Sequence, residues 1–282
     1  MRLPNMPLSV HEDLWIDHPQ GRLFARIWKL PGHADADADA DAGSAAAPIV
    51  LFHDSLGCVD LWRDFPARLS AASGRTVIAY DRLGFGRSDP REGRLPPDFV
   101  ADEAASFFPL VRERLGLRRF IAFGHSVGGG MAVHCAARFA NGCEALVTES
   151  AQAFVGEETR QGIRIAKEGF RQAAQFERLH KYHGDKARWV LDAWTETWLD
   201  PAFAGWSLAA VLPRVSCPLL AIHGACDEYG SPRHPATIAE LSGGPARIAM
   251  LPDTGHVPHR ERPEEVLGLV AGFVRTGDGC RP

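Results

Sequence analysis

The sequence predicts an α/β fold in which helices flank a mostly parallel, doubly wound sheet. From Pro48 onward, short apolar runs rich in β-branched residues alternate with longer amphipathic stretches, and this pattern is typical of repeated βαβ units. The apolar runs are nearly continuous, as expected for parallel strands that are buried on both faces. The chain of 282 residues is long enough for one large core, or for a core with a small inserted domain.

Six apolar segments are predicted to be the core strands. In chain order they span residues 48–54, 75–81, 118–126, 143–150, 218–224 and 246–253. Helices are predicted between them, including 100–116, 128–140 and 263–277. Before the core, residues 12–30 alternate roughly between apolar and polar side chains around a short turn, which indicates a β-hairpin.

The strand–helix alternation defines the expected domains. Residues 1–150 and 218–282 are predicted to form the core domain. Residues 151–217 look helical, contain four of the seven tryptophans and are predicted to be a helical cap inserted between two strands. Residues 31–47 alternate between alanine and aspartate, which cannot build a core, so they are predicted to be a mobile surface loop.

Composition limits the partners and the compartment. A net charge of −4 with 23% charged residues argues against a nucleic-acid partner, and no apolar run is long enough to suggest a membrane partner. The six cysteines contain no C-x-x-C pair and the N-terminus has no signal-peptide pattern, so we expect free thiols in the cytoplasm. The expected partner is a small-molecule substrate, bound by a monomer or homodimer.

A short motif after the third core strand provides the candidate nucleophile. Residues 124–128, with the sequence GHSVG, fit the G-x-S-x-G pattern of a strand–turn–helix elbow. In such a turn the serine takes a strained backbone conformation, and its oxygen lies at a helix N-terminus where free amides favour negative charge. The flanking glycines leave room for the neighbouring strand and helix. Ser126 is therefore the predicted nucleophile.

A serine hydroxyl needs a base to remove its proton and an acid to orient that base. His256 follows the last predicted strand and Asp227 follows the strand before it, so the chain order is serine, acid, histidine. The carboxyl ends of parallel strands meet at one edge of the sheet, so these side chains are expected to converge. His259 remains an alternative base, and Glu228 and Glu149 remain alternative acids.

Two backbone amides are predicted to stabilise an oxyanion. One is the N–H of Val127, directly after the nucleophile, and the other is the N–H of Ser55 in the loop after the first core strand. Asp54 is expected to point away, because its charge would oppose the oxyanion. His180 and His183 have helical spacing and suggest a solvated face, since no third ligand is evident. We predict no metal and no cofactor.

These motifs, in this order, resemble the serine-hydrolase branch of the α/β-hydrolase fold superfamily with a helical cap. The similarity extends from Pro48 to Val274 and rests on HDSLG at 53–57, DRLGFGRSD at 81–89, GHSVGG at 124–129, and HGACDE at 223–228 with GHVPH at 255–259. The resemblance implies a triad of Ser126, Asp227 and His256. Asp54 departs from it, because relatives usually have glycine there. Relatives that open epoxides or displace halide carry aspartate where this chain has Ser126.

The inserted segment is expected to cover the site. Leu191, Trp194 and Trp198 fall on one helical face. That face either packs on the core or lines an apolar pocket for an acyl or aromatic group, and both interpretations remain open. Phe154, next to the end of a core strand, is a further pocket candidate. Such a cap would exclude water and could gate entry.

The predicted function is that of a serine hydrolase. It would cleave a carboxylic ester or related acyl bond of a small, apolar substrate through an acyl-enzyme on Ser126. The same triad would also serve a carbon–carbon bond hydrolase, a lyase, a perhydrolase or an aminopeptidase, and the motifs do not separate these reactions. From another class, a non-catalytic ligand-binding protein of the same fold would keep the pocket without turnover.

Overall fold

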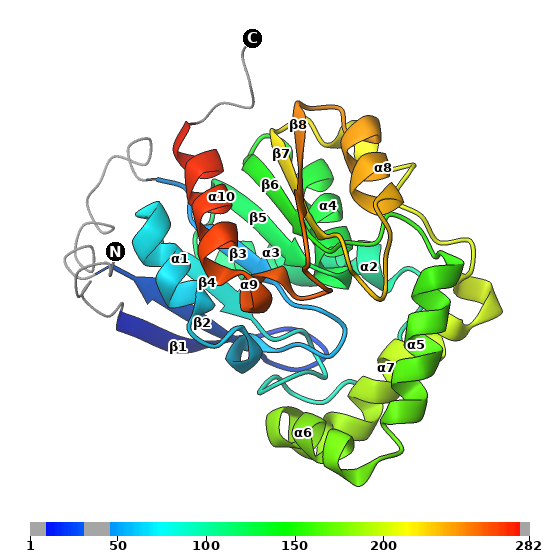
Figure 1. Ribbon diagram of the computed structural model, residues 1–282. Coiled ribbons are helices and arrows are strands. Elements are labelled where there is room, and N and C mark those ends of the chain that lie inside the picture. Colours follow the sequence, from blue (N-terminus) through cyan, green and yellow to red (C-terminus); the bar gives the residue numbers. More distant parts are fainter. Residues whose placement is uncertain (1–9, 31–45, 277–282) are drawn as a thin grey trace.

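The computed structural model describes residues 10–30 and 46–276, which form an eight-stranded sheet flanked by helices (Figure 1). The strands are β1 Val10–Ile16, β2 Leu23–Lys29, β3 Ile49–Phe52, β4 Val77–Tyr80, β5 Phe120–His125, β6 Cys143–Glu149, β7 Leu219–Gly224 and β8 Ala246–Leu251. Their order in the sheet is β1-β2-β4-β3-β5-β6-β7-β8. The pairs β1–β2 and β2–β4 are antiparallel, and the pairs from β4 to β8 are parallel. The predicted fold class is confirmed.

Helices connect the strands. Those of the core are α1 Phe65–Ser73, α2 Phe99–Asp102, α3 Phe108–Arg114, α4 Val127–Arg138, α8 Arg233–Leu241, α9 Pro258–Glu261 and α10 Pro263–Thr276. The single helix predicted over 100–116 is instead interrupted by a π-helical segment, Glu103–Phe107, between α2 and α3. Pro109 contributes to this irregularity, because it has no N–H to donate to the carbonyl four residues earlier. Among the described helices, none is long and apolar enough to cross a membrane.

The alternation of side chains along the strands builds two hydrophobic layers. In β3, Val50 and Phe52 belong to the layer covered by α2, α3 and α4, whereas Ile49 and Leu51 belong to the layer covered by α1 and α10. All four side chains are at most 2% exposed. Burial on both faces explains why β3 to β7 appear in the sequence as continuous apolar runs. The prediction is wrong for β8, which lies at the edge of the sheet and has Ile248 and Met250 exposed.

Three helices lie between β6 and β7, apart from the sheet (Figure 1). They are α5 Glu157–Gly169, α6 Ala173–His183 and α7 Ala187–Leu199. The expectation that His183 lies on a solvated face is wrong: it is 2% exposed, its Nδ1 accepts from the Gly86 N–H (2.9 Å), and its Nε2 donates to the Leu56 carbonyl (2.9 Å). His183 therefore joins the inserted helices to two core loops. Of the predicted mobile loop 31–47, residues 31–45 lie outside the described residues.

The close approach of α4 to the sheet predicts a sharp difference between two glycines. A β-carbon on Gly128 would lie 2.2 Å from the carbonyl oxygen of Phe52 in β3, and this backbone atom cannot easily move aside. We predict that Gly128→Ala lowers the free energy of unfolding by about 1–3 kcal/mol or more, as overpacking does. The measurement is the urea midpoint of unfolding.

The matched control is Gly268→Ala in α10. Nothing lies within 4 Å of the position that its β-carbon would take. Alanine has less backbone freedom in the unfolded chain and a higher helix propensity, so this variant should gain about 0.5–1 kcal/mol. Equal effects of the two substitutions would contradict this packing.

Candidate active site

Ser126 lies in the turn between β5 and α4. Its backbone angles are φ 54° and ψ −125°, a region that residues with a β-carbon rarely occupy, and such strain costs about 1–3 kcal/mol. Two backbone hydrogen bonds hold the turn: the Ser126 N–H donates to the Glu149 carbonyl (2.8 Å), and the Gly129 N–H donates to the Ser126 carbonyl (2.9 Å). The strained turn directs the serine hydroxyl away from both elements and into a cavity.

His256 reaches the serine from the loop after β8. Its Nε2 lies 3.0 Å from the Ser126 Oγ, and the imidazole is 10% exposed. Its Nδ1 lies 2.8 Å from Oδ1 and 2.9 Å from Oδ2 of Asp227. An ionised carboxylate can only accept hydrogen bonds, so Nδ1 carries the proton and Nε2 is left free to accept the serine proton.

Asp227 is held in place by further contacts. Its side chain is 1% exposed, its Oδ1 accepts from the Tyr229 N–H (2.8 Å), and the His223 Nε2 lies 3.3 Å from its Oδ2. The Tyr229 ring stacks edge-on against His256, with ring centroids 4.8 Å apart. The structure thus brings together the three residues that the sequence predicts as a triad.

The electrostatics of the pair favour proton transfer to the histidine. Burial alone would lower the pKa of His256, but the hydrogen bond and the charge of Asp227 outweigh it and raise the pKa above its usual value. Burial would raise the pKa of Asp227, but the hydrogen bond and charge of His256 lower it below the usual range. Each group therefore stabilises the charged form of the other.

The residues considered as an alternative base or acid form no hydrogen bond with the Ser126 hydroxyl. Glu149 and His259 bond to each other, with the His259 Nδ1 2.6 Å from the Glu149 Oε2, and neither contacts the Ser126 hydroxyl. Glu228 lies at the mouth of the cavity in an exposed position. These distances favour His256 as the base and Asp227 as the acid.

A cavity of about 210 Å³ opens at the serine. The residues that line it are Asp54, Ser55, Leu56, Ser126, Gln152, Thr159, Ile163, Trp194, Trp198, Glu228, Tyr229, His256 and Val257. Leu56, Ile163 and the two tryptophans form its apolar wall, and three of these four come from the inserted helices. The helical face with Trp194 and Trp198 therefore packs on the core and also lines the pocket.

Phe154, predicted as a pocket residue, is not among the lining residues. It forms a β-bridge with Ser207 and packs its ring against His234, with centroids 4.5 Å apart. The sequence pattern contains no sign of this bridge. Leu191 packs elsewhere too, in a cluster with Phe85 and Val190.

Gln152 is a site residue that the sequence analysis missed. Its Oε1 lies 3.4 Å from the Ser126 Oγ, and the residue is 3% exposed. Gln152 comes three positions after the end of β6, so inspection of every position beyond a strand end would have found it. Asp54, which is expected to point away from the oxyanion, is one of the residues that line the cavity. No hydrogen bond to its carboxylate is found within the described part of the chain.

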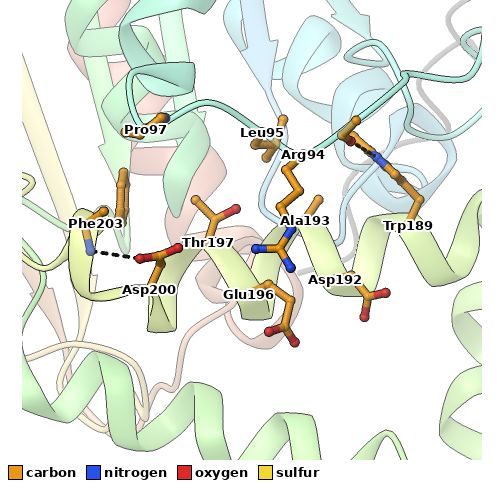
Figure 2. Close-up of a pocket in the computed structure, with 12 residues that line it drawn as sticks. Arg94, Leu95, Pro97, Trp189, Asp192, Ala193, Glu196, Thr197, Asp200 and Phe203 are labelled. Carbon is orange, nitrogen blue, oxygen red and sulfur yellow. Dashed lines mark hydrogen bonds between the residues drawn. The ribbon is translucent and has the colours of Figure 1, made fainter.

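A second cavity lies on the opposite face of α7 and is distinct from the serine site. It measures about 250 Å³ and lies between α7 and residues 93–97 of the core. Figure 2 shows Arg94 reaching across it toward Glu196 of α7, while the Trp189 Nε1 donates to the Gly93 carbonyl (2.7 Å). This cavity contains no nucleophile next to a base, whereas the smaller cavity is lined by both Ser126 and His256.

Among the residues that the structure describes, one buried group offers possible metal ligands. His125, Glu149 and His259 each present a ligand atom, all within 4.8 Å of one another. Hydrogen bonds account for the arrangement, because His259 donates to Glu149 and the His125 Nε2 lies 2.8 Å from the His256 carbonyl oxygen. We therefore interpret the group as a hydrogen-bonded network.

Known proteins resemble this chain in sequence and in fold. Residues 47–263 match the family described as the alpha/beta hydrolase fold, and the chain belongs to this family. The human serine hydrolase BPHL is 28% identical over 210 residues, which are 71% of this chain and 69% of that protein.

Solved structures share the fold. Proline iminopeptidase from Mycobacterium smegmatis superposes with a TM-score of 0.66 at 22% identity, covering 94% of this chain and 98% of that one. The enol-lactonase from Burkholderia xenovorans superposes with a TM-score of 0.67 at 21% identity, covering 93% of this chain and 100% of that one.

The Asp227–His256 pair generates a prediction about proton affinity. Asp227→Asn removes a negative charge and an acceptor from the protonated imidazole, so the pKa of His256 should fall. The measurement is an NMR titration of the imidazole ring protons. Glu240→Gln, at an exposed position in α8, makes the same change in net charge and should leave the titration unchanged. A pKa of His256 unaffected by Asp227→Asn would contradict the pairing.

Proposed function

We propose that the protein is a serine hydrolase that cleaves a carboxylic ester or a related acyl bond of a small, largely apolar substrate. The observation that carries the proposal is the 3.0 Å contact between the Ser126 Oγ and the His256 Nε2, with Asp227 behind the imidazole. His256 removes the hydroxyl proton as Ser126 attacks the carbonyl carbon. It then protonates the leaving group and activates the water that releases the acyl group.

The developing oxyanion would be held by the N–H groups of Val127 and Ser55. Val127 is the first residue of α4, so its N–H has no partner within the helix. Within residues 10–30 and 46–276, neither of these two amides donates to another protein group. Free donors next to the nucleophile are what a tetrahedral intermediate requires.

The inserted helices would act as the cap of the site. Ile163, Trp194 and Trp198 supply apolar surface on one side of the cavity, and His183 fixes these helices to the core. A volume of about 210 Å³ suits a small acyl group better than a long chain. The curated relative BPHL is called a serine hydrolase, which supports the reaction class and leaves the substrate to experiment.

The same three residues would also serve other reactions, namely carbon–carbon bond hydrolysis, lyase chemistry, perhydrolysis and aminopeptidase chemistry. A non-catalytic binding protein of this fold would keep the pocket without turnover. The tautomer of His256 favours turnover over binding alone, since Nε2 is free to act as a base. Product analysis with a plain ester and a β-diketone separates the hydrolytic reactions.

The first test is activity against nitrophenyl esters of increasing acyl length. Short esters should be cleaved fastest, and Ser126→Ala should lower kcat by about 10³-fold or more, because the nucleophile is lost. Ser207→Ala, an exposed serine outside the cavity, is the control. The base acts in its neutral form, so kcat/KM should fall as the pH drops through the raised pKa of His256. Wild-type turnover by Ser126→Ala would refute the proposal.

The charges of the cavity predict discrimination against anions. Asp54 and Glu228 line it, and none of its lining residues is lysine or arginine. The nitrophenyl half-ester of succinate should therefore have a kcat/KM at least about tenfold below that of nitrophenyl butyrate. The ratio of kcat/KM for the butyrate ester to kcat/KM for the succinate half-ester should shrink at high salt and in Asp54→Asn. The same ratio should be unchanged in Glu240→Gln. Equal rates for both esters would contradict the assignment of these charges.

A further inference from the structure

We propose that Glu149 is a positioning residue that keeps the nucleophile and the catalytic histidine in register. The proposal rests on the proposed function, because it concerns how Ser126 and His256 remain within hydrogen-bonding distance. Glu149 is the last residue of β6 and is 0% exposed. A carboxylate in such a place is costly unless every oxygen has a partner.

Glu149 contacts the chain on both sides of the serine–histidine hydrogen bond. Its backbone carbonyl accepts from the Ser126 N–H (2.8 Å), which fixes the strained elbow. Its Oε1 accepts from the His259 N–H (2.7 Å), and its Oε2 accepts from the His259 Nδ1 (2.6 Å). His259 lies three residues after His256, so the carboxylate holds the segment that carries the base.

His125 provides a second connection between the same two segments. It directly precedes the nucleophile, and its Nε2 lies 2.8 Å from the carbonyl oxygen of His256. A carbonyl can only accept, so this nitrogen carries a proton. Burial lowers the pKa of His125 to about 4, so the ring is neutral near pH 7. The elbow and the histidine loop are therefore joined by two buried contacts that do not involve the reacting atoms.

The charge state of Glu149 is consistent with this role. Burial would raise the pKa of Glu149, but the charge of His259 and the hydrogen bonds that it donates outweigh burial and lower the pKa below the usual value. The ionised carboxylate accepts two hydrogen bonds with fixed directions. The His259 N–H lies in the first turn of α9, where it has no partner within the helix, so Glu149 also satisfies this donor.

A positioning role differs from an electrostatic role in what it predicts. The carboxylate contacts His259 and does not contact the imidazole of His256, which bonds Asp227 instead. Loss of Glu149 should therefore disturb the geometry of attack and leave the proton affinity of His256 nearly unchanged. Small displacements of a catalytic group lower the rate by as much as about 10²-fold.

The experiment measures kcat, KM and the acid limb of the pH profile for Glu149→Ala with a short nitrophenyl ester. We expect kcat to fall about 10- to 100-fold while KM changes by less than about threefold. The acid limb should shift less than it does in Asp227→Asn. Glu149→Gln keeps an oxygen acceptor and should recover part of kcat.

Glu103→Gln is the matched control. Glu103 is the other buried glutamate in the described part of the chain (4% exposed), and it bonds the Tyr80 hydroxyl. This variant should lose stability without the same loss of kcat, when each protein is assayed well below its own Tm. Should Glu149→Ala not fold, His125→Ala removes the other connection and should show the same fall in kcat at nearly constant KM.

The outcomes separate this proposal from the proposed function. If a fluorophosphonate fails to label Ser126 in the wild-type protein, the proposed function itself is wrong. If the wild-type protein is labelled and Glu149→Ala, or His125→Ala in its place, keeps the wild-type kcat, the positioning role alone is wrong. A loss confined to KM, or a kcat loss matched by Glu103→Gln, also overturns it.

Discussion

The hydrogen bond between Ser126 and His256 joins residues 130 positions apart, and the site depends on it. A serine hydroxyl in water is a weak nucleophile, and it gains reactivity only when an imidazole in the correct tautomer lies within about 3 Å. The parallel sheet supplies this closeness, because it directs the carboxyl ends of β5, β7 and β8 to one edge. The loops beyond these strands then carry the serine, the aspartate and the histidine.

The contact between Ser126 and His256 is accompanied by a strained backbone and by buried carboxylates, both of which are energetically unfavourable. Ser126 holds a backbone conformation with positive φ, and Glu149 and Asp227 are carboxylates with almost no solvent contact. Each is stabilised by specific partners: backbone hydrogen bonds for the serine, and histidines with backbone amides for the acids. Two rigid hydrophobic layers on either face of the sheet keep those partners in place, which allows strain and buried charge to persist at one edge.

Much of this arrangement could be predicted from the sequence, because it follows from periodicity and strand order. Continuous apolar runs predicted the strands, although β8 at the sheet edge is mostly exposed, and the loops after the strands predicted Ser126, Asp227 and His256. Two of the predictions that failed concern contacts between distant segments. His183 lies on a helix that the sequence suggests is solvated, yet it bonds two core loops. Phe154 forms a β-bridge with Ser207 and is not among the residues that line the cavity. Neither partner lies near its residue in the sequence, so no local pattern could reveal it.

The most direct test of the account is a crystal structure of the protein after reaction with a small fluorophosphonate. The phosphorus should be bonded to the Ser126 Oγ, with one phosphoryl oxygen within hydrogen-bonding distance of the Val127 and Ser55 amides. The His256 Nε2 should remain next to the adduct. An adduct on another residue, or an adduct on Ser126 whose oxygen faces neither amide, would contradict the account.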